Sequence, residues 1–227
     1  DGNEPIEKQG QVRWYKKPVK GQTYMVALDP SLGTGGDNSA IQILELPNLV
    51  QVAEWMHNKT PIVQQVAIMR EICGYLAECI GEPNDVYYSV ENNTLGEAAL
   101  VSIAEIGEEN IPGVFLSEPR SHGNAKRFRK GFNTTHRSKL SACAKMKSLI
   151  ETKRLNLNSK NLISEMKCFV ATGNSYSAKP GEKDDLVMSL LLAIRMTNVV
   201  RNYDASIEER MKDHLDDIIE PMPFILM

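Results

Sequence analysis

Two apolar, strand-like stretches of this chain each end on an acidic residue, and a third acidic pair opens a late apolar helix. The stretch YMVAL ends at Asp29, VYYSV ends at Glu91, and Asp184 and Asp185 precede LVMSLLLAI. Apolar runs of this kind are typical of elements buried in one core. A fold that gathers their ends brings the acids together, where they raise each other's pKa unless a cation lies between them.

Oxygen-only sites suit hard divalent cations, so the acids predict a Mg²⁺ (or Mn²⁺) site. We predict Asp29, Glu91, Asp184 and Asp185 as metal-ligating and catalytic residues of a phosphodiester-cleaving enzyme. In two-metal phosphoryl transfer, ions roughly 3.5–4 Å apart hold the attacking and the leaving oxygens. Asp29 is the predicted bridge between two ions, and Glu91 and Asp184 are the predicted outer ligands. Which of Asp184 and Asp185 faces the metal stays open.

Each acid also has a structural interpretation. Asp29 before Pro30 is compatible with a turn, and Glu91 with an ordinary strand end. Either residue of the 184–185 pair is a good helix N-cap, although a cap accounts for one Asp better than for two. Asp37 in GGDN either stabilises a hairpin turn, which we favour, or approaches the metals.

The hydrophobic periodicity predicts three strands, a helix, a strand and then mainly helices. The first three strands, 23–28, 40–46 and 50–56, form an antiparallel meander. This order is that of the ribonuclease H-like α/β fold, a mixed central sheet (antiparallel three-strand meander plus parallel strands) flanked by helices. In this fold the first strand and the strand after the first helix lie side by side, which would place Asp29 next to Glu91. The later elements are expected at 61–80, 86–90, 95–106, 114–116, 138–153, 159–168, 169–180 (a hairpin) and 184–201.

Composition and the predicted elements divide the chain into three segments: an irregular lead-in or linker (1–20), the ribonuclease H-like domain that carries the acids and is the predicted nuclease domain (21–203), and an acidic C-terminal tail (204–227), expected as a solvated helix. No apolar run approaches the roughly 18 residues that span a bilayer, so no membrane association is predicted. The four cysteines include no C-x-x-C pair, and we expect them reduced.

A basic stretch stands out in a chain whose net charge is −3. Residues 119–150 contain nine Lys or Arg and no acid. Such a stretch either meets a polyanion or is simply solvated, and we favour DNA. Contacts to phosphates are independent of base sequence and weaken with salt. The predicted DNA-binding residues are Arg120, Lys126, Arg127, Arg129, Lys130 and Arg137.

The motifs VALDPSLGTGGD, YSVENNTLG and KDDLVMSLLLA together resemble the C-terminal nuclease domain of the large terminase subunit of tailed double-stranded DNA phages, particularly the T4-like group. The resemblance spans residues 24–201. It implies an endonuclease that cuts concatemeric double-stranded DNA with little sequence specificity, using a triad that falls on Asp29, Glu91 and Asp184, with Asp185 beside it. It also implies a packaging machine on the procapsid, in the cytoplasm of an infected bacterium.

The resemblance further implies partners. Large terminases carry a packaging ATPase in an N-terminal domain and work with a portal and a small terminase subunit. The chain contains no G-x-x-x-x-G-K-[ST] loop, so we expect the ATPase domain elsewhere in the parent protein.

Two other functions fit parts of the pattern. A phosphotransferase lobe of the actin and sugar-kinase type shares the fold, but it requires a second lobe to enclose a nucleotide, and only one is present. A non-catalytic DNA-docking module of a packaging assembly would keep the basic stretch without needing four acids. ATP-dependent thermal shifts and metal-dependent plasmid cleavage distinguish these functions.

Overall fold

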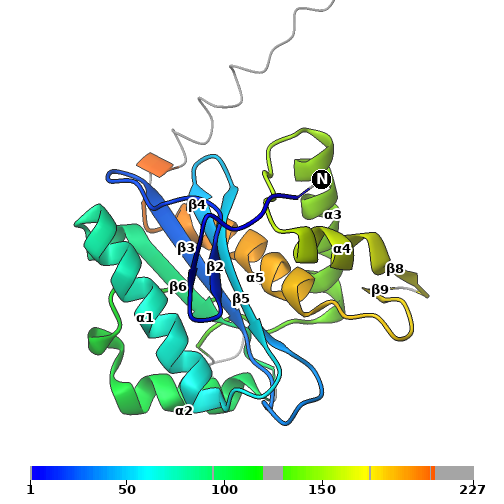
Figure 1. The fold of residues 1–227 in the computed structure, drawn as a ribbon, viewed down its shortest axis with the longest axis horizontal. Coiled ribbons are helices and arrows are strands. Elements are labelled where there is room, and N and C mark those ends of the chain that lie inside the picture. Colours follow the sequence, from blue (N-terminus) through cyan, green and yellow to red (C-terminus); the bar gives the residue numbers. More distant parts are fainter. Residues whose placement is uncertain (1, 94, 120–129, 174, 205, 208–227) are drawn as a thin grey trace, which may run out of the picture.

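The fold is a seven-stranded mixed sheet with helices on both faces (Figure 1). The computed structural model describes residues 2–93, 95–119, 130–173, 175–204 and 206–207. The strand order is β1-β2-β5-β4-β3-β6-β7, with β3, β6 and β7 parallel and the other pairs antiparallel. This arrangement confirms the predicted ribonuclease H-like sheet. The strands are β1 (Glu7–Gln9), β2 (Val12–Trp14), β3 (Thr23–Asp29), β4 (Ser39–Leu46), β5 (Val50–His57), β6 (Val86–Val90) and β7 (Val114–Phe115).

The prediction of an irregular backbone over residues 1–20 is wrong. β1 and β2 form a hairpin that extends the sheet beyond the meander, because β2 pairs with β5. Val12 and Trp14 on β2 are buried, but strands of three residues are too short to show a clear period in the sequence.

Alternation along β3 divides the core into two layers. Tyr24, Val26 and Leu28 pack with α1 (Ile62–Ile80) and α2 (Gly96–Ile106). Met25 and Ala27 pack on the other side, with α5 (Asp185–Val200) and α3 (His136–Glu151). Because successive strand side chains point to opposite faces, the residue after Leu28 belongs to the face that α5 covers.

Helix α5 crosses one face of the sheet and is buried nearly all round (Figure 1). This explains its continuous apolar sequence, which is typical of a helix covered on every side. Its outer neighbours are α3 and α4 (Lys160–Cys168), and β8 (Phe169–Thr172) and β9 (Ser175–Ala178) form the predicted hairpin after α4. Ser189 on α5 donates to the carbonyl of Ala27 at 2.8 Å, which fixes the helix against β3.

Several element ends differ slightly from the prediction. α3 begins two residues early, because Thr135 caps it and forms a capping box with Ser138. Short 3₁₀ helices at Pro83–Asp85 and Glu108–Asn110 were not predicted. The predicted tail helix lies almost wholly outside the described residues. Within the described part of the chain, no helix has the length and apolar character needed to cross a membrane.

Candidate metal centre

Asp29 and Glu91 lie side by side at the carboxyl ends of two parallel strands. Leu28 pairs with Val90 in the register of β3 and β6, and the Glu91 N–H donates to the Leu28 carbonyl at 3.0 Å. Val86, Tyr88 and Val90 pack toward α1, so Glu91, like Asp29, belongs to the α5 face. Two acids that are far apart in the sequence thus meet because parallel strands end at one edge of the sheet.

The acid pair at the start of α5 completes the cluster. Asp184 occupies the N-cap position, and Asp185 is the first residue of the helix. Asp185 Oδ2 accepts hydrogen bonds from the backbone N–H of Asn38 at 3.2 Å and from its side-chain amide at 2.7 Å. Asp184 Oδ2 accepts from the N–H of Ala178, the last residue of β9, at 3.1 Å. The residue before β4, the end of the β8–β9 hairpin and the start of α5 therefore meet at this acid pair.

The other three acids act on the pKa of Asp29. Burial raises the pKa of Asp29 well above its usual value, and the neighbouring carboxyls of Glu91, Asp185 and Asp184 raise it further. Burial also raises the pKa of Asp185, against the opposing effect of the two hydrogen bonds from Asn38. Within the described part of the chain, no Lys or Arg forms an ion pair with any of the four.

The donor set suits a hard divalent cation. The Glu91 carboxyl adds to the effect of burial in raising the pKa of Asp29, and a cation between the two carboxyls would oppose that effect. Among the described residues, no three Asp, Glu, His or Cys side chains yet form a closed metal-binding group. The chemistry and charge of the cluster fit a cation, and closing around it requires side-chain movement.

The residues after Glu91 have structural roles that the sequence left open. Asn93 Oδ1 accepts from the N–H groups of Leu95 and Gly96 at 3.0 Å each, which begins α2. A Cβ atom at Gly96 would lie 1.9 Å from the Glu91 carbonyl oxygen, so only glycine permits this approach. Glu91 itself is only 4% exposed. The segment after β6 thus folds back tightly beside this acid.

Asp37 lies beside the cluster and is paired. Its Oδ1 is 2.9 Å from Lys183 Nζ, which also donates to the Gly36 carbonyl at 3.3 Å. The side chain of Asp37 is exposed. Lys183 therefore ties the hairpin between β3 and β4 to the segment that leads into the acid pair. The turn role of Asp37 stays a prediction.

A fifth acid, Glu165 on α4, was not predicted. Its Oε2 accepts from the N–H groups of Leu186 at 2.8 Å and Val187 at 3.2 Å. Burial raises the pKa of Glu165 to about 7, the N–H of Val187 opposes the rise, and the charges of Asp185 and Asp184 add to it. A single Glu within NLISEMK carries no sequence signal for such a role. The role of Asn38 in holding Asp185 was also not predicted, although the neighbouring Asp37 was considered.

Only part of the predicted DNA-binding set can be placed. Arg120, Lys126, Arg127 and Arg129 lie outside the described residues. Lys130 and Arg137 are exposed, and Lys130 forms an ion pair with Glu108. Part of the basic stretch, residues 119–132, is called the basic segment below. Asn92 joins it to the acid cluster, because the Asn92 N–H donates to the Phe132 carbonyl at 2.7 Å and the Asn92 side-chain amide donates to the Lys130 carbonyl at 2.9 Å.

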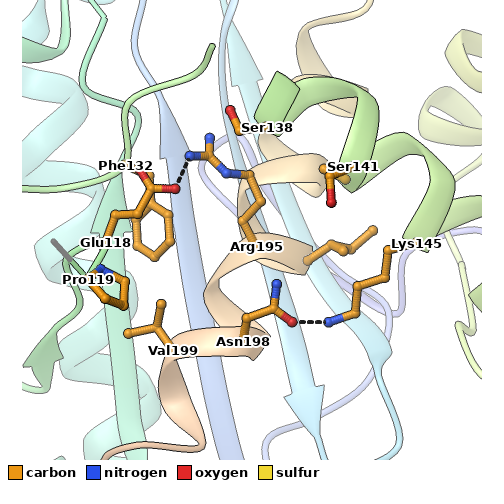
Figure 2. A pocket seen from close by; sticks show the side chains of 11 residues that line it. Glu118, Pro119, Phe132, Ser138, Ser141, Lys145, Arg195, Asn198 and Val199 are labelled. Carbon is orange, nitrogen blue, oxygen red and sulfur yellow. Dashed lines mark hydrogen bonds and ion pairs between the residues drawn. The ribbon is translucent and has the colours of Figure 1, made fainter. Parts of the chain in front are cut away.

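Arg195 on α5 contacts both flanks of the basic segment, and Figure 2 shows its contact with Glu118. It donates to Glu118 Oε1 at 2.7 Å on one side, and to the Asn133 carbonyl at 2.9 Å and Thr134 Oγ1 at 2.9 Å on the other. Its guanidinium lies 5.4 Å from the centre of the Phe132 ring, close enough for a cation–π contact. The flanks of the basic segment are therefore anchored to the helix that carries the acid pair.

A cavity of about 200 Å³ lies next to Arg195, between α3 and α5. Lys145 lines it and points inward, donating to Thr197 Oγ1 at 2.7 Å and Asn198 Oδ1 at 2.5 Å. Burial lowers the pKa of Lys145 to about 8. This lysine belongs to the basic stretch in the sequence, but the structure uses it inside the fold.

The fold and the acid cluster together define a ribonuclease H-like protein with a candidate acidic active site. A family model described as the terminase RNaseH-like domain matches residues 26–197. The chain belongs to this family, which confirms the terminase resemblance. Its assignment to the T4-like group stays a prediction.

Solved structures share the fold at low sequence identity. The magnesium-bound large terminase nuclease of the thermophilic phage G20c is 18% identical, with a TM-score of 0.63, covering 85% of this chain and 91% of that one. The large terminase nuclease domain of Thermus phage P74-26 is 20% identical, with a TM-score of 0.58, covering 84% and 88%. The human cytomegalovirus terminase nuclease domain is 13% identical, with a TM-score of 0.51, covering 82% and 86%.

Proposed function

We propose that this chain is the DNA-cutting domain of a viral packaging terminase, a divalent-metal-dependent endonuclease acting on double-stranded DNA with little sequence specificity. The observation that carries the proposal is the cluster of Asp29, Glu91, Asp184 and Asp185, in which Asp29 has a strongly raised pKa. Acids with pKa values perturbed by burial and by one another are typical of functional sites.

The roles of the four acids follow from their positions. Asp29 lies among the other three and is the candidate bridge between two Mg²⁺ or Mn²⁺ ions, with Glu91 as an outer ligand. Asp185 raises the pKa of Asp29 more than Asp184 does, which favours Asp185 as the direct ligand from α5. When bound, the ions would lower the pKa of a water nucleophile and stabilise charge on the phosphate. Asn38 orients Asp185 through two hydrogen bonds, as the partners of metal ligands typically do.

The basic segment supplies the proposed DNA contact. Its flanks adjoin Glu91 through Asn92 and Phe132, so phosphates held there would lie near the acids. Lys126, Arg127, Arg129 and Lys130 are the proposed contacts, with Arg120 and Arg137 beside them. The partners proposed from the family are an N-terminal ATPase domain, a portal and a small terminase subunit. The proposed location of this packaging machine is the cytoplasm of an infected bacterium.

The related structures support metal use. The phage G20c nuclease was solved with bound magnesium, cobalt and zinc, and the cytomegalovirus domain after soaking in manganese. Hard and borderline divalent ions in one fold are what a carboxylate-lined site accommodates. The same class of cofactor is proposed here on the chain's own four acids.

Plasmid cleavage tests the proposal. Supercoiled plasmid should be nicked and linearised in Mn²⁺ or Mg²⁺ and stay intact in EDTA. Asp29→Asn should lose cleavage while retaining DNA binding in a mobility-shift assay. The exposed acid Glu151 provides the control, because Glu151→Gln should cleave like the wild type. An Asp29→Asn protein with full activity would exclude the mechanism, and a wild type that binds DNA without cutting it would indicate a docking module.

A further inference from the structure

The first turn of α5 is capped by a residue from a different helix. Asp184 is the N-cap residue of α5, yet its side chain makes no capping hydrogen bond. Glu165 on α4 accepts from the N–H groups of Leu186 and Val187 instead, with one oxygen at 2.8 and 3.2 Å. These are the second and third residues of the helix, whose N–H groups an N-cap side chain ordinarily takes.

This substitution changes what the acid pair can do. When an Asp caps its own helix, one of its carboxylate oxygens accepts hydrogen bonds from those N–H groups. Here Asp184 instead turns one oxygen to Ala178, and Asp185 turns one to Asn38. Within the described part of the chain, the other oxygen of each carboxyl accepts no hydrogen bond.

We infer that Glu165 is a positioning residue, which caps α5 from outside so that the carboxyls of Asp184 and Asp185 remain available to a divalent cation. The inference rests on the proposed function for the identity of that ligand. The capping itself stands on the two hydrogen bonds alone. Residues that orient metal ligands typically change metal affinity by about 10–100-fold when they are altered.

Reach matters more than charge in this contact. Both N–H groups bind a single oxygen, and a Gln side chain of equal length presents an amide oxygen at the same place. An Asp side chain keeps the carboxylate but is one methylene shorter, so it falls short of the helix end. Glu165→Gln and Glu165→Asp therefore separate the two properties.

The experiment compares these variants with the wild type and with Glu151→Asp, a matched change on an exposed helical Glu. Amide hydrogen exchange of Leu186 and Val187, followed by NMR without metal, reports the capping. Mn²⁺ titration by calorimetry reports the site. Glu165→Asp should speed exchange at both amides by about tenfold, the loss of roughly one hydrogen bond. It should also weaken Mn²⁺ binding by about 10-fold or more. Glu165→Gln and Glu151→Asp should match the wild type in both readouts.

The outcomes separate this inference from the proposed function. Unchanged exchange and Mn²⁺ affinity in Glu165→Asp would overturn the inference, as would a Glu165→Gln protein as impaired as Glu165→Asp. Faster exchange with unaltered Mn²⁺ affinity would overturn the positioning role while leaving the cap. A wild type that binds no Mn²⁺ at all would instead refute the proposed metal site, and the exchange data would still decide whether Glu165 caps α5.

Discussion

Asp29 follows six buried residues in its strand, and its carboxyl lies near Glu91 and near the two acids at the start of α5. Repulsion between these carboxylates lowers the stability of the folded protein, and this effect comes from the acidic site. A cation between the carboxyls would relieve it, and so would a proton at low pH. If the acid cluster binds the proposed metal, metal binding, protonation and stability are linked through it.

The raised pKa of Asp29 predicts a pH-dependent stability difference. The unfolded chain has an Asp pKa near 3.9, so it loses this proton as pH rises above about 4. The folded protein still keeps the proton at these pH values, because the pKa of Asp29 is raised. The free energy of unfolding of the metal-free wild type therefore falls as pH rises from that value toward the raised pKa. Asp29→Asn lacks this loss and should melt at a higher temperature than the wild type at pH 8 in EDTA. Each kcal/mol gained corresponds to about 2–4 °C in a chain of this size.

Thermal melts at pH 4 and pH 8 check this expectation. The advantage of Asp29→Asn should shrink at the lower pH, where the wild-type carboxyl is protonated. Equal melting differences at both pH values would show that Asp29 is ionised without strain.

A comparison of the two acids of α5 tests which one binds the metal. Asp185 raises the pKa of Asp29 more than Asp184 does, and Asn38 fixes its side chain. Asp184 is hydrogen-bonded to Ala178 in the β8–β9 hairpin instead. Asp185→Asn should therefore weaken Mn²⁺ binding more than Asp184→Asn does, as measured by calorimetry. The reverse order would assign the direct ligand to Asp184.

At the scale of elements, the strand ends and the helix start were predictable because each has its own local pattern. The apolar runs before Asp29 and Glu91 indicated β3 and β6, and the parallel register then followed from the order of the elements. β1 and β2 were not predictable, since three-residue strands carry too short a period. Glu165 was missed for a different reason: its partners are backbone N–H groups, which leave no trace in the sequence.

Arg195 is the element-scale link between α5 and the basic segment. Arg195→Ala removes the ion pair with Glu118 and the bonds to Asn133 and Thr134. Since Glu118 stays partly exposed, we expect a loss of about 1–3 kcal/mol in the free energy of unfolding, measured by urea denaturation. DNA affinity should fall while Mn²⁺ affinity is unchanged.

The exposed Arg70 provides a matched control, because it makes one hydrogen bond, to the Asn110 carbonyl. Arg70→Ala should change the free energy of unfolding by no more than about 0.5 kcal/mol. A similar small change in Arg195→Ala would show that the flanks of the basic segment hold without this residue.

At the scale of the whole molecule, the acid cluster and the flanks of the basic segment lie next to each other. The acids gather at one end of β3 and β6, and the flanks of the basic segment adjoin them through Asn92. Under the proposed function, this layout would place the phosphates of DNA near the cluster of carboxylates. The basic stretch was visible in the sequence, but its attachment beside Glu91 came only from the fold.

The basic segment should determine the salt dependence of DNA binding. Lys126→Ala with Arg127→Ala should weaken binding to any duplex sequence and reduce the slope of log K against log salt by about 2. Fluorescence anisotropy at several salt concentrations measures the slope. Lys8→Ala with Lys17→Ala, two exposed lysines of the N-terminal region, is the control and should leave it unchanged. An unaltered slope in the first variant would place the DNA elsewhere.

A crystal structure after soaking in Mn²⁺ tests the central claim most directly, because anomalous scattering identifies the ion. We predict two peaks roughly 3.5–4 Å apart, with Asp29 between them and with Glu91 and the acid pair of α5 as further ligands. Well-ordered crystals without manganese among these carboxyls, at concentrations that support cleavage, would contradict the account.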